Sequence, residues 1–380
     1  MDPRQRLLAV FNGDRPDTIP VSFFIQEEFL AWYYPDKSQI RRLEEAIECA
    51  SELDIDLMVR SKEFEIPHFM NKSFPGWDLV NYNKVSGNNI HVIFEITTPK
   101  GKLRQVESGP NIKRAGSGIH RTITEYLIKD TKDLEIFCEY VPQIDNETIE
   151  RMHKYTSYAL KTIGRRGLFV PWGWSGVFNQ AANYKDPVEL MMGPYIEPEL
   201  YDLYMDKITL LEIQYNCELA KCDVDGIGIQ GNVANSAMMG RDFFDAHILP
   251  YEKRLAEAIK ENNKFTIYHN CGKSKVLVPS YIKMGIDAWE TVAEPPQGDI
   301  TLKEAKDIAK DSLILIGNLD QVSFLKNASV EQIDEKVHSM METGKTGGHY
   351  IFAASDFLES DTPIENVKAA VRAARKYGIL

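Results

Sequence analysis

The sequence His269-Asn270-Cys271-Gly272 follows directly after the apolar run 265–268. Side chains alternate along a strand, so His269 and Cys271 are expected on the same side of the chain as it leaves that run. Zinc accepts a mixed nitrogen and sulfur shell, and a catalytic zinc site needs three protein ligands with one open position. The pair therefore predicts part of a metal site. The alternative is that both are ordinary buried residues.

The composition fits a globular enzyme of 380 residues, with 43% hydrophobic and 26% charged residues. Lys and Arg number 44 against 56 Asp and Glu, and this net charge of −12 argues against nucleic acid or an anionic membrane as the main partner. No apolar run reaches the length of a membrane span, so we expect a cytoplasmic protein. Its five cysteines are scattered and odd in number, which is typical of reduced thiols.

Short apolar runs alternate with amphipathic stretches along most of the chain. Eight runs resemble strands: 19–24, 55–59, 168–172, 226–230, 265–269, 286–289, 313–316 and 350–354. The helical stretches include 39–53, 148–164, 198–221, 243–262, 274–284, 302–310, 330–344 and 364–377. Such alternation requires parallel pairing with right-handed crossovers, and eight units are the number in a closed barrel. We predict an α/β fold, a (β/α)8 TIM barrel; an open, doubly wound sheet is the alternative.

One segment departs from this alternation. Residues 90–124 contain the strand-like runs 90–96, 102–107 and 119–124, with a turn at 98–101 between the first two. We therefore predict an antiparallel β-hairpin insertion at 90–124, after barrel strand two. The chain shows neither an internal repeat nor a long linker, so a single domain over 1–380 is the simplest organisation.

In a barrel the residues that follow the strands meet at one face and build the site. Glu290 follows the sixth strand and Asp356 the eighth; they are the candidate catalytic carboxylates and further metal ligands, with a structural hydrogen bond and a loop cap as the alternatives. Aromatic and amide side chains at the same face suit an apolar ligand pocket. The candidate substrate-binding residues are Phe24, Trp172, Trp174, Gln230 and Asn232. The two tryptophans could instead simply close the barrel top.

Several motifs resemble the uroporphyrinogen decarboxylase superfamily over nearly the whole chain. They are R-x-x-L-x-A-V-F-x-G-D-R-P from Arg4, H-x-C-G from His269, G-I-D-A-x-E from Gly285, L-I-G-N-L-D from Leu315 and D-T-P-I-E-N from Asp361. The H-x-C-G motif is similar to that of the corrinoid-dependent methyltransferase branch. The resemblance implies a (β/α)8 barrel with zinc near its mouth, acting with a corrinoid (cobalamin) protein as partner.

The superfamily's decarboxylase activity fits the residues poorly. The decarboxylase pattern has an arginine-rich stretch after strand one and an aspartate after strand two. Here the first loop reads Phe-Phe-Ile-Gln-Glu-Glu over 23–28, and Arg60-Ser61-Lys62 follows strand two. A substrate with many carboxylates needs several guanidinium groups, so an acidic first loop would repel it.

The methyltransferase pattern also differs in one ligand. The coenzyme M branch has a second cysteine after the last strand, whereas residues 353–363 contain none and Asp356 stands closest to that position. His269, Cys271 and Asp356, with Glu290 as a fourth candidate, would form an oxygen-richer shell and a more electrophilic ion, suited to activating an ether or alcohol oxygen.

We therefore expect a zinc-dependent methyltransferase that moves a methyl group from a small donor to cob(I)alamin on a corrinoid protein. A methoxylated aromatic is the first choice of donor, making the reaction an O-demethylation; methanol, methylamine and glycine-betaine-like compounds follow. The alternatives are a methylcorrinoid:thiol methyltransferase of the coenzyme M type, uroporphyrinogen decarboxylase, and a binding module without metal. The oligomeric state is left open, a homo-oligomer included.

Overall fold

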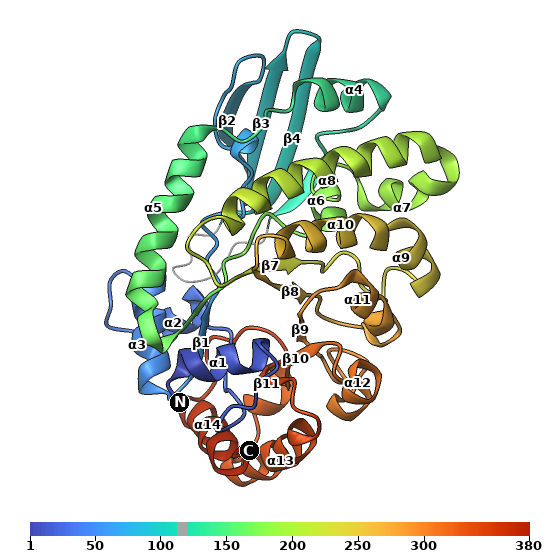
Figure 1. The fold of residues 1–380 in the computed structure, drawn as a ribbon. Coiled ribbons are helices and arrows are strands. Elements are labelled where there is room, and N and C mark those ends of the chain that lie inside the picture. Colours follow the sequence, from blue (N-terminus) through green and yellow to red (C-terminus); the bar gives the residue numbers. More distant parts are fainter. Residues whose placement is uncertain (112–120) are drawn as a thin grey trace.

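The computed structural model describes residues 1–111 and 121–380, and within these seven strands run parallel in two sheets (Figure 1). One sheet pairs β1 (Leu57–Val59) with β6 (Gly167–Phe169). The other has the order β11-β10-β9-β8-β7, with bounds Tyr350–Ala354, Ile314–Leu319, Ala288–Thr291, Phe265–His269 and Gly226–Gln230. The predicted α/β fold with parallel strands is confirmed.

Hydrogen bonds outside the named strands join the two parallel sheets at both ends. Between β6 and β7, the Gly228 N–H donates to the carbonyl of Pro171 (2.9 Å). Between β11 and β1, a segment near the N-terminus lies between the strands: the Phe352 N–H donates to the carbonyl of Pro20 (2.9 Å), and the Asp56 N–H donates to the carbonyl of Val21 (2.7 Å).

The two predicted strands that contain a proline are both shorter than expected. Residues 19–24 form only a bridge from Val21 to Phe352. Pro20 has no N–H, and the Val21 N–H donates to the Asp56 carboxylate (2.8 Å), so the ladder does not extend. Pro171 similarly interrupts the run 168–172, where β6 ends at residue 169 and Trp172 forms an isolated bridge.

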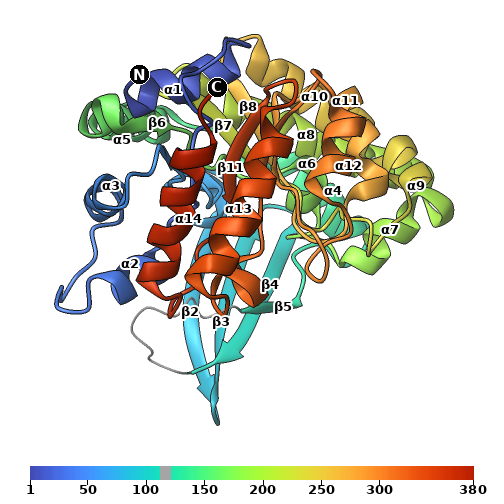
Figure 2. The ribbon, with the colours of Figure 1, turned by 90° about the horizontal axis from the view of Figure 1, so that it is seen from below.

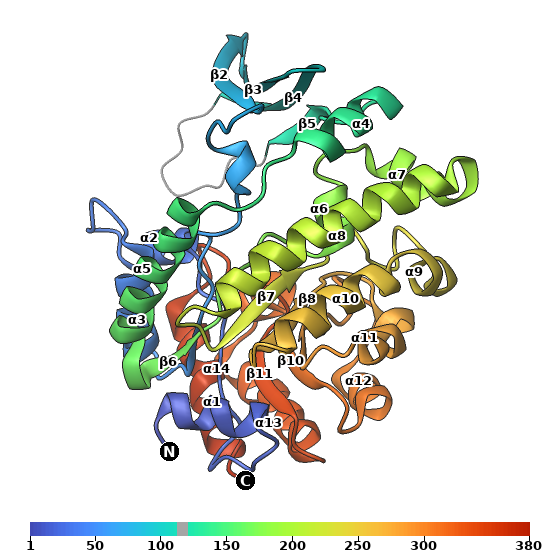
Figure 3. The ribbon, with the colours of Figure 1, turned by 45° about the horizontal axis from the view of Figure 1, so that its top comes forward.

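Helices surround the parallel strands (Figures 1 and 3). The predicted helix over 243–262 is wrong as a single helix, because Pro250 lacks the N–H that a continuous helix needs and the chain forms two helices instead. No described helix is long and apolar enough to span a membrane. The α-helices are α1 Pro3–Phe11, α2 Glu27–Tyr33, α3 Arg42–Glu52, α4 Thr131–Tyr140, α5 Asn146–Ile163, α6 Val177–Ala181, α7 Pro187–Ile196, α8 Pro198–Ala220, α9 Arg241–His247, α10 Leu249–Lys260, α11 Val278–Met284, α12 Leu302–Ala309, α13 Val330–Lys345 and α14 Ile364–Tyr377.

An antiparallel sheet extends from one side of the molecule (Figure 2). Its strands are β2 Asp78–Ser86, β3 Asn89–Thr98, β4 Gly101–Pro110 and β5 Thr122–Glu125, and they lie between β1 and β6 in the sequence. The sheet therefore begins well before residue 90, the start of the predicted insertion. The sequence did not reveal β2, because this strand is polar and largely exposed and gives little hydrophobic signal. Of the strand expected at 119–124, residues 119 and 120 lie outside the described part of the chain.

The buried space inside the parallel strands is filled by aliphatic side chains, closed at one end by α1. The residues of this cluster include Leu7 and Val10 from α1, and Met58, Leu168, Val170, Ile267, Ala288, Ile314, Ile316, Ile351 and Ala353 from the strands and their extensions. Because side chains alternate along a strand, residues two positions beyond these point toward the same interior. That alternation decides which polar side chains meet beyond the aliphatic layer.

Candidate functional site

Four polar or aromatic side chains gather in the interior above the aliphatic layer. Arg60, Trp172, His269 and Glu290 each stand two residues beyond an inward aliphatic residue, namely Met58, Val170, Ile267 and Ala288. All four are buried, with at most 6% of each residue exposed. The strand period thus brings together residues that are up to 230 positions apart in sequence.

Three ligand atoms, one each from His269, Cys271 and Asp356, lie within 4.8 Å of one another. The Nε2 atom of His269 is 3.9 Å from Oδ1 of Asp356. Cys271 and Asp356 are only partly buried, and the Asp356 side chain keeps 25% of its surface, so the cluster can be reached from outside. Imidazole nitrogen, thiol sulfur and carboxylate oxygen are together a donor set that suits zinc. We call these three residues the ligand cluster.

Neighbouring groups hold the ligand cluster in place. The Oδ1 atom of Asn232 accepts hydrogen bonds from the backbone N–H (3.3 Å) and the thiol (3.5 Å) of Cys271. Oδ1 of Asp356 accepts a hydrogen bond from the backbone N–H of Phe357 (2.8 Å). Both ligands after the strand ends are therefore fixed by contacts within their own loops or to the loop beside them.

Burial and neighbouring charges shift the pKa values of His269 and Asp356 in the ligand cluster. Burial lowers the pKa of His269, but its hydrogen bonds to Cys271 and Glu290 and the Asp356 carboxylate outweigh burial and raise the pKa to about 10. Burial raises the pKa of Asp356, while the neighbouring His269 opposes this rise. The imidazole is thus surrounded by groups that favour a positive charge at its position, which is an environment that also favours a cation.

Glu290 lies beside Nδ1 of the His269 imidazole, whereas Asp356 lies nearer Nε2. Oε2 of Glu290 is 3.1 Å from Nδ1 of His269, and Oε1 of Glu290 accepts a hydrogen bond from Nη2 of Arg60 (2.8 Å). Burial raises the pKa of Glu290, but the Arg60 guanidinium and the hydrogen bond to His269 lower it to about 2. Both carboxylate oxygens therefore have partners, and Glu290 is not one of the three residues of the ligand cluster.

The two predicted tryptophans lie in different places. The ring of Trp172 is 5.5 Å from that of His269, and Phe24 contacts both rings at 5.9 and 6.4 Å, edge to face in each case. Trp174 instead packs on the rings of Tyr215 (4.3 Å) and His68 (5.5 Å). The sequence cannot distinguish the surroundings of the two tryptophans. Only Gly173 lies between them, and both follow the end of β6.

Two further residues were not singled out as site residues in the sequence. Arg60 follows the second predicted strand and departs from the decarboxylase pattern, and its place two residues beyond the inward Met58 could have located it in the interior. Glu65 accepts a hydrogen bond from Nε2 of Gln230 (3.2 Å), and Gln230 pairs with His269 in the β7–β8 register. Gln230 and Asn232 therefore both lie beside the ligand cluster, each held by a different neighbour.

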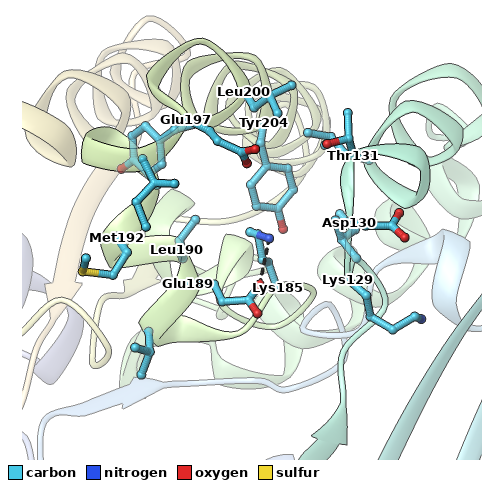
Figure 4. Close-up of a pocket in the computed structure, with 16 residues that line it drawn as sticks. Lys129, Asp130, Thr131, Lys185, Glu189, Leu190, Met192, Glu197, Leu200 and Tyr204 are labelled. Carbon is cyan, nitrogen blue, oxygen red and sulfur yellow. Dashed lines mark hydrogen bonds and ion pairs between the residues drawn. The ribbon is translucent and has the colours of Figure 1, made fainter.

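A separate cavity of about 490 Å³ lies between α4, α7 and α8 (Figure 4). Its lining includes Leu190, Leu200 and Tyr204, together with Lys185 and Glu189, which form an ion pair (3.0 Å). None of the residues predicted for the site lines this cavity.

Comparisons with known proteins place these observations in a family. The family model described as uroporphyrinogen decarboxylase (URO-D) matches residues 171–377, which include the ligand cluster. A solved structure described as a methyltransferase from Methanosarcina mazei has a TM-score of 0.71 at 17% identity, covering 99% of each chain. The fold is therefore shared with that methyltransferase.

Proteins similar in sequence to this chain include methylcobamide:CoM methyltransferases and uroporphyrinogen decarboxylases. Methylcobamide:CoM methyltransferase MtbA of Methanosarcina acetivorans is 27% identical over 50% of this chain and 51% of its own length. MtbA of Methanosarcina mazei is 24% identical over 71% of this chain and 75% of its own length. A uroporphyrinogen decarboxylase of Geotalea daltonii is 24% identical over 64% of this chain and 69% of its own length. The chain thus spans between half and three quarters of these relatives, and the resemblance to the superfamily and its corrinoid methyltransferase branch is confirmed.

Proposed function

Because the chain belongs to the uroporphyrinogen decarboxylase family, we propose that it is a zinc-dependent methyltransferase acting on a small methyl donor and the cob(I)alamin of a corrinoid protein. The observation that carries the proposal is the ligand cluster, in which His269, Cys271 and Asp356 place three ligand atoms within 4.8 Å of one another. The relatives named methylcobamide:CoM methyltransferases support corrinoid chemistry.

We propose that His269, Cys271 and Asp356 hold the metal. Glu290, the fourth ligand candidate from the sequence, contacts Arg60 and Nδ1 of His269 instead. A zinc ion in the ligand cluster would supply a Lewis acid that stabilises negative charge on the donor's departing oxygen. In the proposed reaction the C–O bond of the donor would break, and cob(I)alamin, as a substrate, would supply the electron pair of the new bond between cobalt and the methyl carbon. The oxygen keeps the electron pair and takes up a proton, so a methoxyarene becomes a phenol.

The protein's own side chains would bind and orient the donor. Phe24 and Trp172 present aromatic rings beside His269, and such rings suit a flat apolar molecule. Asn232 holds the Cys271 thiol in place through its amide oxygen. A donor and a corrinoid protein would approach from the side of Asp356, whose side chain keeps 25% of its surface exposed. A methoxylated aromatic donor is therefore the first to test.

The alternative within the family is transfer of the methyl group to a thiol. The relatives named methylcobamide:CoM methyltransferases favour that direction by name. The presence of Asp356 in the ligand cluster favours the donor side, because a carboxylate ligand leaves the ion a stronger Lewis acid than a second thiolate does. A thiolate-rich shell would instead suit an acceptor thiol.

We also propose that the two parallel sheets close into one (β/α)8 barrel within a single domain over 1–380, with the antiparallel strands as an insertion. The hydrogen bonds that join β6 to β7, and β11 to β1 through the Val21 segment, support closure. In a closed barrel the corrinoid protein would dock over the loops that follow the strands, since these loops carry the ligand cluster.

The experiment is an anaerobic assay of the purified protein after its zinc content is measured. The protein is mixed with reduced cobalamin and a methoxyarene, and methylcobalamin and phenol are followed together. We expect about one zinc per chain and equal amounts of both products. Methyl transfer only from methylcobalamin to a thiol would establish the alternative direction. Coproporphyrinogen formation from uroporphyrinogen without any methylcobalamin would falsify the methyltransferase proposal.

A further inference from the structure

Arg60 is a buried cation that reaches across the interior from one parallel sheet to the other. It follows β1, and its Nη2 donates to Oε1 of Glu290 on β9 (2.8 Å). Only 1% of the Arg60 side chain and 8% of the Glu290 side chain are exposed. Solvent therefore contributes little to this ion pair, and the geometry of the pair is set by the protein around it.

Two further contacts fix the guanidinium of Arg60. Nη1 donates to the carbonyl of Val170 (3.4 Å), and the guanidinium carbon lies 5.1 Å from the ring centroid of Trp172. A planar guanidinium that stacks on an indole and binds a carboxylate has little freedom to rotate. Arg60 thus presents a nearly fixed donor to Glu290.

Glu290 passes this constraint on to the imidazole of His269. Its second oxygen, Oε2, is 3.1 Å from Nδ1 of His269, which leaves Nε2 as the ring nitrogen facing Asp356. A ring whose far nitrogen binds a carboxylate keeps one orientation, and such support typically changes metal affinity 10- to 100-fold when it is lost.

We propose that Arg60 is a positioning residue for the ligand cluster: through Glu290 it holds the His269 ring so that Nε2 faces Cys271 and Asp356. This inference rests on the proposed function, since it treats the ligand cluster as a metal site. It also gives Glu290 the role of orienting a ligand instead of being one. Arg60 itself touches neither donor nor metal.

The test measures metal binding without any corrinoid. Zinc affinity of the metal-free protein is determined by competition with a chelator, and the visible spectrum of the cobalt(II)-loaded protein reports the ligand geometry. The variants are Arg60→Met, Arg60→Lys, Glu290→Gln and the double variant Arg60→Met/Glu290→Gln. Arg4→Met is the matched control, because Arg4 forms a two-pronged ion pair with Asp225 outside the ligand cluster.

We expect Arg60→Met and Glu290→Gln each to weaken zinc binding roughly tenfold or more and to alter the cobalt spectrum. Arg60→Lys should have a smaller effect, because it keeps the charge but loses the planar fork. If Arg60 acts through Glu290, the double variant should bind zinc about as weakly as Glu290→Gln alone. Arg4→Met should bind zinc as the wild type does.

Thermal unfolding of each variant shows that it is folded, and Arg60→Lys carries the test if Arg60→Met does not fold. Folded Arg60 variants with wild-type zinc affinity and an unchanged cobalt spectrum would overturn the inference. So would effects of Arg60→Met and Glu290→Gln that simply add. A wild-type protein that binds zinc but transfers no methyl group overturns the proposed function alone, because these measurements do not depend on turnover.

Discussion

Asp356 is the residue on which the choice of chemistry depends. Its Oδ1 is 3.9 Å from Nε2 of His269, and its carboxylate completes the ligand cluster. We expect Asp356→Ala to lower zinc affinity roughly tenfold or more, whereas Asp356→Cys should retain tight binding because a thiolate is also a good zinc ligand. The cysteine variant should lose activity with the oxygen donor, because its ion is a weaker Lewis acid.

The measurement is zinc affinity together with methylcobalamin formation from a methoxyarene. Asp361→Ala is the control: this exposed aspartate lies in the same loop, and it pairs with Lys326 outside the ligand cluster. Wild-type zinc affinity in Asp356→Ala would show that the third ligand is another residue.

The sequence could indicate residue identities at the site but not all of their contacts. The spacing of His269 and Cys271 predicted that they point the same way, and both belong to the ligand cluster. Trp172 and Trp174 were both predicted to bind substrate because they are aromatic and follow the same strand, yet Trp174 packs on Tyr215. Side-chain alternation holds only while the chain stays extended, so prediction weakens once a strand has ended.

At the scale of elements, Glu252 joins α10 to the start of α6. Its buried carboxylate accepts a hydrogen bond from the backbone N–H of Phe178 (3.1 Å). Burial raises the pKa of Glu252 from 4.5 to about 7, although the N–H groups of Phe178 and Val177 oppose the rise. The folded protein therefore keeps a proton here that the unfolded chain releases between these two values.

This proton makes stability depend on pH. Because the pKa of Glu252 is raised in the folded protein, this carboxyl contributes stability that is fully present below about pH 4.5 and is lost as pH rises through about 7. The loss of unfolding free energy amounts to about 3 kcal/mol. Glu252→Gln should remove this loss, so the variant gains stability relative to the wild type as pH rises. Chemical unfolding at several pH values measures the difference, with the half-exposed Glu257→Gln on the same helix as control. Parallel profiles for Glu252→Gln and the wild type would contradict the assignment.

Element boundaries were predictable where local signals agreed with the tertiary structure. The predicted strand 350–354 coincides with β11, and the predicted helix 364–377 coincides with α14. The run 19–24 failed as a strand because the Val21 N–H binds a side chain, Asp56, that lies far away in sequence. β2 was missed because its polar residues face solvent, and hydrophobic alternation cannot reveal such a strand.

At the scale of the whole molecule, Asp56 connects the two ends of the chain to the parallel strands. Its side chain is completely buried, and Nη1 of Arg6 on α1 (2.5 Å) and Nη1 of Arg375 on α14 (2.9 Å) donate to its carboxylate. The Val21 N–H donates to the same carboxylate (2.8 Å). One side chain thus ties together the first helix, the last helix and the segment that lies between β1 and β11.

We therefore expect Asp56→Ala to lower the free energy of unfolding by about 3 kcal/mol, because it removes one acceptor from each of two partly buried guanidinium groups and leaves the buried Val21 N–H without its side-chain acceptor. Asp54→Asn is the matched control: Asp54 also binds Arg375 (3.0 Å) but is 73% exposed, so its loss should cost no more than about 1 kcal/mol. Chemical unfolding compares both variants with the wild type. If Asp56 joins the chain ends as inferred, Asp56→Ala should also increase hydrogen exchange in α1 and α14 together, while exchange in β8 and β9 stays slow. An equal, small loss in both variants would show that the ion pairs at Asp56 contribute little to holding the ends of the chain against the strands.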